Sequence, residues 1–318
     1  MSSAAARFGL ACCLWATACG ETRLIGAACP GPDCALAGRQ ALDPVVCGAQ
    51  FASTPVRLAA GEILDRCQLF TLDALPVAGD DGQVYLTGAQ ALLSPVGQHL
   101  DVRLAPAIDG FYDGPVPCEE LYARAVPWIP LMTTQQGDDR LDLSGAPLVA
   151  SASHRMLINH QMVNATGRPI EVSVVMQIEC ADSRPAIVSQ AFEFSDRERQ
   201  HVLPGQRALV SGGCVFDKDV LVSRLYRRTH LISAFSVKTL RGAGEGELLW
   251  SSGLEWTLDL EPPLPVAAGE GFRWECAYDN TGDLPFEVGG DSPDACALLG
   301  LYRLPGGGED DSPERCTR

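Results

Sequence analysis

A ten-residue run of strict alternation near the middle of the chain most constrains its fold. Between Glu171 and Cys180, apolar side chains occupy every second position, and polar side chains fill most of the positions between them. A period of two residues is typical of a half-buried β-strand. The run from Met156 to Met162 has the same period, and an Asn/Gly/Pro-rich segment over 164–169 separates the two. The sequence therefore predicts a β-hairpin over 152–180.

Two histidines lie on the apolar face of the first predicted strand. His154 and His160 have the same parity as Met156, Ile158 and Met162, so all five side chains are expected on one side of the strand. Imidazoles and thioethers on one face fit a packed core with satisfied histidines. They equally fit part of a site for a soft metal. Both interpretations stay open at this point.

Short runs of alternating apolar and polar residues recur along the chain and predict an all-β protein. Many short strands with Gly/Pro turns favour antiparallel sandwiches, and 318 residues suffice for two domains. We expect two tandem antiparallel β-sandwiches over 56–182 and 183–318, with the break near 181–185. Further strands are expected over 67–72, 84–86, 98–104, 191–194, 208–210, 230–237, 247–250, 256–260, 271–278 and 297–304.

The cysteine content indicates an oxidising compartment. Thirteen cysteines occur without CxxC pairs of zinc-finger spacing, which favours a disulfide framework in an exported protein. The N-terminus agrees, because Arg7 precedes a short apolar run over 8–18 that ends at Cys19. The small residues before Cys19 resemble a bacterial lipobox. We therefore expect a signal peptide over 1–19 and lipidation of Cys19.

Lipidation would make the protein an outer-membrane lipoprotein that faces the periplasm or the cell surface, with a lipid anchor as its membrane contact. Secretion after simple cleavage of the signal is the alternative. Residues 20–55 are rich in Ala, Gly, Pro and Cys. They are expected to form a tether that is held in place by Cys29, Cys34 and Cys47. The net charge of −16 argues against a nucleic-acid partner, because no basic patch exists to neutralise phosphates.

Common catalytic templates are missing from the sequence. The chain has no G-x-S-x-G elbow, no HExxH, no Walker loop and no GxGxxG opening a βαβ unit. A family resemblance is visible instead in the order of its landmarks. These are Cys67-Gln-Leu-Phe-Thr-Leu, Gln98-His99-Leu, Ile158-Asn-His160-Gln-Met, Thr229-His230-Leu-Ile232, Phe272-Arg-Trp-Glu-Cys276 and Asp294-Ala295-Cys296.

In this order they resemble the type II copper, ascorbate-dependent monooxygenases, relatives of peptidylglycine α-hydroxylating monooxygenase that include a bacterial lipoprotein branch. The resemblance covers roughly residues 55–318. It implies two jelly-roll-like sandwiches that face each other across a solvent cleft. It also implies three disulfides, which are Cys67–Cys180, Cys276–Cys296 and Cys214–Cys316, and it leaves Cys118 to pair within 29–47 or elsewhere.

The resemblance further implies two copper sites, of which this chain retains only part. The electron-transfer site keeps His99 and His160, whereas Gln98 replaces one imidazole. The oxygen site keeps His230, but Ile232 and Ala295 stand where a histidine and a methionine are expected, so only three of six ligands remain. Met162 offers a replacement thioether near His160 and His99, with Gln98 as a further accessory group. His154 and His201 are better interpreted as structural or surface histidines.

Two hypotheses follow. The first is a divergent copper monooxygenase with impaired hydroxylation, in which His99, His160 and His230 hold copper; the family implies ascorbate or a quinol-like reductant and a hydrophobic or peptide-like substrate. A copper-binding protein without catalysis is a variant of it.

The second hypothesis is a non-catalytic surface binding or scaffold lipoprotein that kept the fold and lost the metals. Its ligand would be an unidentified small molecule or peptide-like compound. The test is whether His99, His160 and Met162 converge on one point.

Overall fold

The computed structural model describes residues 23–26, 42–43, 45–77, 82–94, 97–106, 113–122, 128–134, 138–195, 199–228, 232–241, 244–252, 256–288, 296–307 and 314–317. The signal peptide, Cys19, His230 and Ala295 lie outside these residues, so their assignments stay predictions. Cys29 and Cys34 lie outside them as well. Gln98 and Cys316 are placed in strands, but their side chains are not described.

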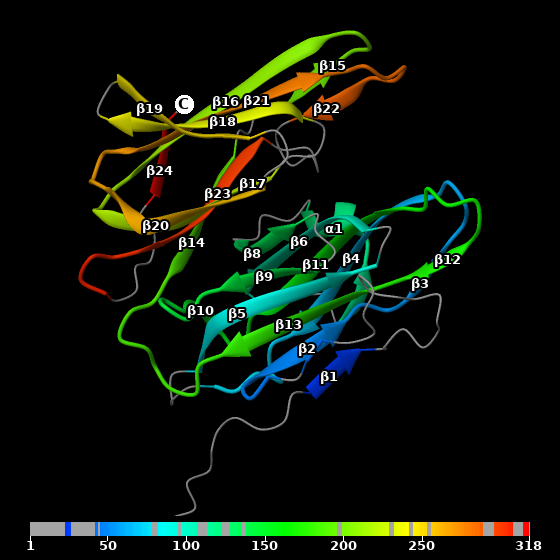
Figure 1. Cartoon of the computed structure of the whole chain (residues 1–318), viewed down its shortest axis with the longest axis horizontal. Coiled ribbons are helices and arrows are strands. Elements are labelled where there is room, and N and C mark those ends of the chain that lie inside the picture. The colour runs from blue at the N-terminus through cyan, green and yellow to red at the C-terminus, as the bar shows by residue number, and fades with distance from the viewer. Residues whose placement is uncertain are drawn as a thin grey trace, which may run out of the picture.

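The N-terminal half folds into two facing sheets (Figure 1). Strand pairs in the described residues of these sheets are antiparallel, except for the parallel pair β1–β2. The first sheet contains β1 (Arg23–Gly26), β2 (Gly48–Ala52), β13 (Val174–Cys180), β5 (Gln83–Leu93) and β10 (Leu148–Ser151), with β9 (Asp138–Asp142) paired to β5. The second contains β7 (Gly114–Val116), β4 (Ile63–Thr71), β11 (Arg155–Val163), β6 (Gly97–Ala105) and β8 (Ile129–Thr134). A ribbon of β3 (Val56–Leu58) and β12 (Ile170–Val172) and the short helix α1 (Cys118–Tyr122) complete this half.

The C-terminal half repeats the pattern of packed antiparallel sheets. Its first sheet contains β14 (Gln190–Ser195), β23 (Ala297–Arg303), β17 (Val220–Arg228) and β20 (Thr257–Val266). Its second contains β19 (Gly244–Ser252), β18 (Ile232–Arg241), β21 (Gly271–Asp279), β16 (Arg207–Phe216) and β24 (Glu314–Thr317). A small ribbon pairs β15 (Gln200–Val202) with β22 (Phe286–Val288).

Successive strands of the N-terminal half change sheets, from β4 to β5 and back to β6, which gives a jelly-roll-like sandwich. The predicted all-β, jelly-roll-like and disulfide-linked fold is therefore confirmed. The chain passes between the two sets of sheets in the segment from β13 to β14, which includes the predicted break at 181–185. The division into two independent domains at that point stays a prediction.

The predicted hairpin over 152–180 is wrong, although both of its strands exist. β11 pairs with β4 and β6 in one sheet, whereas β13 pairs with β2 and β5 in the other. Met156 and Ile158 of β11 pack in the same core cluster as Met176 and Ile178 of β13. Two strands that face one core from opposite sheets show the same alternation as two neighbours, so the pattern identified the buried faces but not the partners.

The expected tether over 20–55 is also wrong, because this segment contains two strands of the first sheet, β1 and β2. β2 lies within the first sheet between β1 and β13, and its Phe51 is fully buried. This strand is short and contains glycine and alanine, which weaken the periodic signal that identifies a strand. The first sheet of the sandwich therefore already includes β1 and β2, both of which precede the expected start at residue 56.

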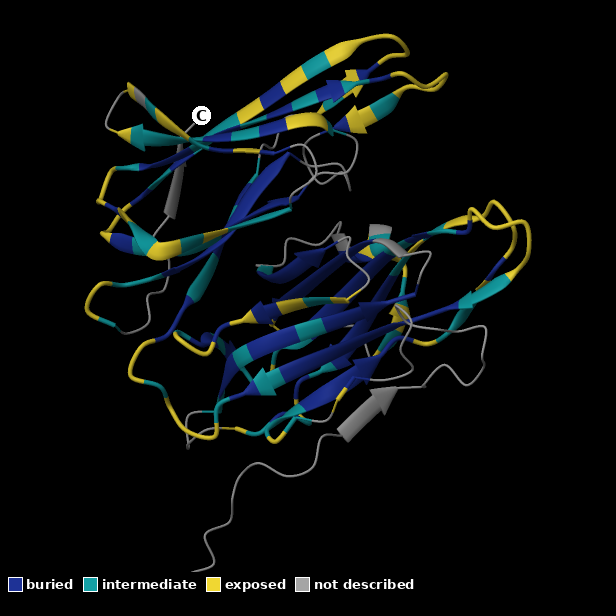
Figure 2. Ribbon diagram, viewed as in Figure 1, coloured by how far each residue is buried: buried dark blue, intermediate teal, exposed yellow. Residues whose placement is uncertain are grey.

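The inner strands β23 and β17 of the β14–β23–β17–β20 sheet are largely buried on both faces, whereas the edge strand β20 is mostly exposed or half-buried. Phe192, Phe194 and Leu298 on one face belong to the core of the C-terminal half. Tyr226 and Leu299, which are paired across β17 and β23, belong instead to the core cluster of the N-terminal half. Buried strands face each other across the junction between the halves (Figure 2). The two halves are therefore packed through apolar side chains at this sheet.

The disulfides agree only in part with the expected pairings. Cys276–Cys296 is confirmed. Cys214 is disulfide-bonded and lies opposite Cys316 in the register of β16 and β24, as the predicted Cys214–Cys316 bridge requires.

Cys67–Cys180 is wrong, because Cys67 is bonded to Cys118 and Cys180 is a buried free cysteine. The reason is the sheet assignment: Cys67 points to the outer face of the second sheet, whereas Cys180 packs in the core of the sandwich. For Cys118 the sequence left open a partner within 29–47 or elsewhere, and the structure shows the second alternative, the bond to Cys67. Cys47 is itself disulfide-bonded.

We predict that peptide mapping of the oxidised protein will find Cys67 linked to Cys118. Cys180 should react with an alkylating reagent only after denaturation, because it is buried and burial raises the pKa of its thiol to about 12. Mass spectrometry after alkylation in native and denaturing buffer measures both features. A linked peptide that contains Cys67 and Cys180 would contradict the structure.

Candidate functional site

His99 and His160 point to opposite faces of one sheet. In the register of β6 against β11, His99 lies opposite Gln161, and His160 lies opposite Leu100. Residues opposite each other in an antiparallel pair share a face, and successive residues alternate between faces. Leu100 packs in the sandwich core, so His160 faces inward and His99 faces outward. The predicted convergence of these histidines with Met162 is therefore wrong.

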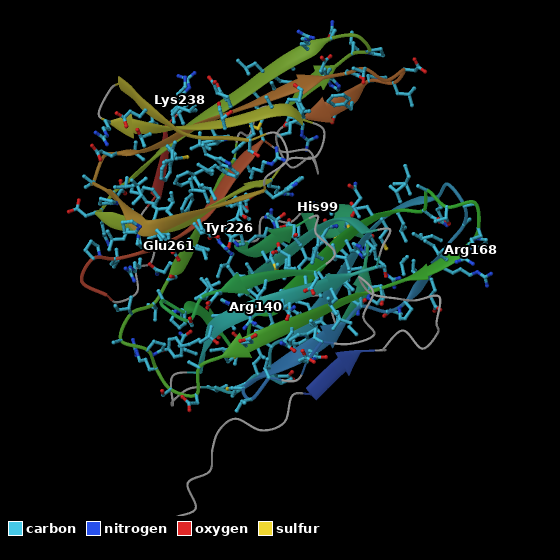
Figure 3. All side chains as sticks on the ribbon, viewed as in Figure 1. His99, Arg140, Arg168, Tyr226, Lys238 and Glu261 are labelled. Atoms are coloured by element: carbon cyan, nitrogen blue, oxygen red, sulfur yellow. A yellow bond between two sulfur atoms is a disulfide. The ribbon has the colours of Figure 1, made fainter. Side chains whose placement is uncertain are left out.

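The outward face at His99 is covered by the C-terminal half. The imidazole of His99 is 1 % exposed, and its ring centroid lies 5.2 Å from that of Trp256. The guanidinium of Arg227 lies 4.6 Å from the centroid of the same indole. Figure 3 labels His99 at this junction. The solvent cleft that the family resemblance implies is therefore absent at His99.

A cluster of four charges, of which three are buried and Glu193 is part-buried, adjoins His99 and joins the two halves. Arg103 donates from Nε to Asp101 at 2.7 Å and from Nη1 to Glu193 at 2.7 Å. Arg228 lies 3.2 Å from Glu193 and 3.8 Å from Asp101. Asp101 and Arg103 come from β6, whereas Glu193 and Arg228 come from β14 and β17. Two cations therefore match two anions, which is the condition under which buried charges are tolerated.

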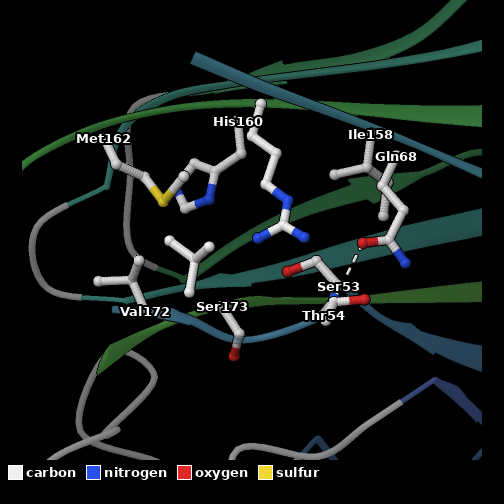
Figure 4. Close-up of a pocket in the computed structure, with 10 residues that line it drawn as sticks. Ser53, Thr54, Gln68, Ile158, His160, Met162, Val172 and Ser173 are labelled. Atoms are coloured by element: carbon white, nitrogen blue, oxygen red, sulfur yellow. Dashed lines mark hydrogen bonds between the residues drawn. The ribbon is translucent and has the colours of Figure 1, made fainter. Parts of the chain in front are cut away.

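His160 lines a pocket at one end of the N-terminal sandwich (Figure 4). The pocket has a volume of about 250 Å³, part of which is open to solvent. β4 and β11 supply one wall, and the segments around β2, β3 and β12 supply the other. The described lining residues are Ser53, Thr54, Val56, Arg66, Gln68, Ile158, His160, Met162, Val172 and Ser173.

Strand register explains why the polar members of the pocket meet. Arg66 lies opposite His160, and Gln68 lies opposite Ile158, so these side chains share the inner face of the sheet. Further along the same face, Met156 lies opposite Phe70 in the apolar core. The inner face is therefore apolar at one end and polar at the other. Gln68 is fixed there by the N–H of Thr54, which donates to its Oε1 at 2.9 Å (Figure 4).

His160 is held neutral in this pocket. Its side chain is almost completely buried, and desolvation lowers its pKa from 6.5 to about 3. Burial also lowers the pKa of Arg66, although a guanidinium stays charged at neutral pH. The buried Nε2 of His160 and Nη1 of Arg66 have no hydrogen-bond partner among the described residues. Buried polar atoms in this state require a ligand or ordered water.

The remaining candidate residues have separate environments. His154 accepts a 3.4 Å hydrogen bond from the N–H of Ser151, and His201 is exposed with Glu287 at 3.3 Å, in line with the structural and surface roles expected of them. Over the described ranges, no group of three or more His, Cys, Asp or Glu side chains is placed to hold a metal ion. The part of the chain that the structure describes also has no helix long and apolar enough to cross a membrane.

Arg66 and the four-charge cluster were not singled out from the sequence. A signal for Arg66 existed, because it shares parity with Gln68 and Phe70 along one strand and so had to point inward with them. The strand expected over 98–104 places His99, Asp101 and Arg103 on one face, because alternate residues of a strand share a face. Their partners Glu193 and Arg228 come from the other half of the chain, and no local pattern indicates a contact over such a separation.

Comparison with known protein families and with characterised proteins finds no match. Among solved structures, the major capsid protein P2 of bacteriophage PM2 is similar, with 9 % identity and a TM-score of 0.35 over 81 % of this chain and 100 % of that chain. A chain of cowpea mosaic virus particles has 9 % identity and a TM-score of 0.32 over 80 % and 88 %. The N-glycanase PNGase F has 8 % identity and a TM-score of 0.30 over 83 % and 99 %. Likenesses of this size carry no argument about function.

We predict that Arg103→Ala lowers the free energy of unfolding by about 3–5 kcal/mol, because Asp101 and Glu193 would stay buried without their main cation. Chemical denaturation measures the change. Arg207→Ala is the matched control, since Arg207 is 84 % exposed in its pair with Asp279 and its removal should have little effect. Equal effects of the two substitutions would contradict the role assigned to the cluster.

A second prediction concerns pH. Because the folded-state pKa of His160 lies below its unfolded value, the unfolded chain binds the extra proton between pH 6.5 and about 3. The stability of the wild type relative to His160→Gln should therefore fall as pH decreases through this window, by up to about 1.4 kcal/mol per unit. Arg66 is the charged group that faces His160 among the described lining residues, and it acts in the same direction. A stability difference that is flat with pH would refute this; His201→Gln, at an exposed site, is the control.

Proposed function

We propose that this protein is an exported, non-catalytic binding or scaffold protein. One observation carries the proposal: His99 and His160 face opposite sides of the same sheet, so they do not form the electron-transfer copper site that the monooxygenase resemblance implies. His99 is occupied by packing against Trp256, and His160 lines a separate pocket. Packing and disulfides maintain a fold independently of its metal ligands, so the resemblance is compatible with a binding role.

The proposal includes attachment to a membrane through a lipid on Cys19, as the lipobox-like sequence suggests. It also includes a small-molecule or peptide-like ligand, for which the pocket at His160 is the candidate site. The divergent copper monooxygenase and the copper-binding protein are the competing proposals. They require copper at His230 and at a histidine of the N-terminal half.

Copper content separates these proposals. The full chain is exported to an oxidising compartment in the presence of copper, purified without chelators, and analysed for metal per chain by mass spectrometry. We expect substoichiometric copper in the wild type, with the same value in His99→Ala, His160→Ala and His230→Ala. The exposed His201 supplies the control variant His201→Ala.

About one copper per chain that is lost in His160→Ala or His230→Ala, but kept in His201→Ala, would overturn the proposal in favour of a copper protein. Turnover of a peptide substrate with ascorbate by that loaded protein would identify the monooxygenase.

A further inference from the structure

The pocket at His160 combines one cation, Arg66, with apolar walls. Arg66 is the charged residue among the described lining residues, and these include no carboxylate. Its Nη1 is buried without a hydrogen-bond partner in the described part of the chain. The acidic neighbour in sequence, Asp65, points to the opposite face of β4, where Asn159 donates to it at 2.6 Å. The positive charge of Arg66 is therefore available to a ligand.

His160 adds a second unsatisfied group to the same space. Its side chain is 3 % exposed, and its Nε2 has no hydrogen-bond partner among the described residues. With its proton on Nε2, the neutral imidazole donates to an acceptor that also meets Arg66. The Oγ of Ser173 is likewise unsatisfied, but in Figure 4 it points away from His160, so it is not included in this pair.

The size of the pocket and its other walls restrict the ligand. The volume of about 250 Å³ includes open solvent at the mouth, so most of a bound ligand would lie at the mouth and only one group would reach inward. The enclosed part has space only for a water-sized group, such as one oxygen atom of an acid. Val56, Val172 and Met162 line the remainder and offer contact to a short aliphatic chain. A guanidinium binds carboxylates and phosphates alike, and the apolar wall favours the carboxylate because this anion can carry a hydrocarbon chain.

We propose that this pocket binds a short aliphatic carboxylate, with one carboxylate oxygen between Arg66 and His160 and the hydrocarbon chain against Val56, Val172 and Met162. The proposal deepens the binding function proposed above and rests on it. It names the class of ligand, which is a small monocarboxylic acid in its ionised form.

The test uses the full chain after removal of metal with EDTA, and sodium butyrate is the probe. Butyrate should raise the melting temperature with a saturable dependence on concentration at constant ionic strength. Butyramide, which has the same shape without the charge, and sodium chloride should have no saturable effect. Arg66→Met should weaken the apparent affinity about tenfold or more, because a charge-assisted hydrogen bond is lost. Arg168→Gln, which removes an exposed arginine, should leave the affinity unchanged.

A second readout applies even if Arg66→Met does not fold. The ¹³C-labelled methyl group of Met162 in the wild type should shift on addition of butyrate and not on addition of butyramide. Equal responses to butyrate, butyramide and chloride, or no saturable response, would show that the pocket holds water only and would overturn the proposal.

This result is independent of the copper measurement. Failure of butyrate binding with copper at background rejects the carboxylate site and leaves the binding or scaffold function. Stoichiometric copper rejects that function whatever the response to butyrate.

Discussion

Four charges on facing strands, three of them buried and one part-buried, determine how the two halves of this protein meet. Asp101 and Arg103 of β6 meet Glu193 and Arg228 across the junction, and each acid has an arginine on either side. Charges removed from water are tolerated only when they are matched in this way, so the cluster specifies the contact more than it strengthens it. The cluster keeps the outer face of β6 away from solvent. The inner face of the same sheet is buried in the sandwich core, so the sheet is covered on both sides at β6.

A sheet that is buried on both sides separates two environments. Successive residues of a strand point to opposite faces of the sheet. Two side chains on opposite faces therefore do not meet, even when their residues are neighbours in sequence or across strands. His160 therefore shares its space with Arg66 and Met162, whereas His99 shares its space with Trp256. The first compartment is small, neutral at its histidine and cationic at its arginine. The function proposed here follows from that partition and not from the identity of the histidines.

The sequence predicted what period and composition control. Alternation located about half of the strands that the structure describes, among them β21, whose alternate residues Phe272, Trp274 and Cys276 share one buried face. The family resemblance implied the disulfide Cys276–Cys296, which the structure contains. Strand pairing was harder to predict, because β11 and β13 have the periodicity of a hairpin but lie in different sheets. The partner that the family resemblance implied for Cys67 was also wrong. The candidate site depends on strand register and on contacts between the halves, which local patterns do not encode.

The unpaired thiol of Cys180 has a consequence for handling the molecule outside the cell. It lies at the end of β13, where its backbone N–H donates to the carbonyl of Cys47, a residue that is itself in a disulfide. In the folded chain the sulfur keeps its proton and is shielded. Once the chain opens, the same sulfur acquires an ordinary acidity and meets several disulfides in a flexible polymer, where exchange reactions proceed readily above neutral pH. Heat denaturation in alkaline buffer should therefore scramble the bridges and be irreversible, whereas an acidic buffer would preserve the native connectivity for refolding.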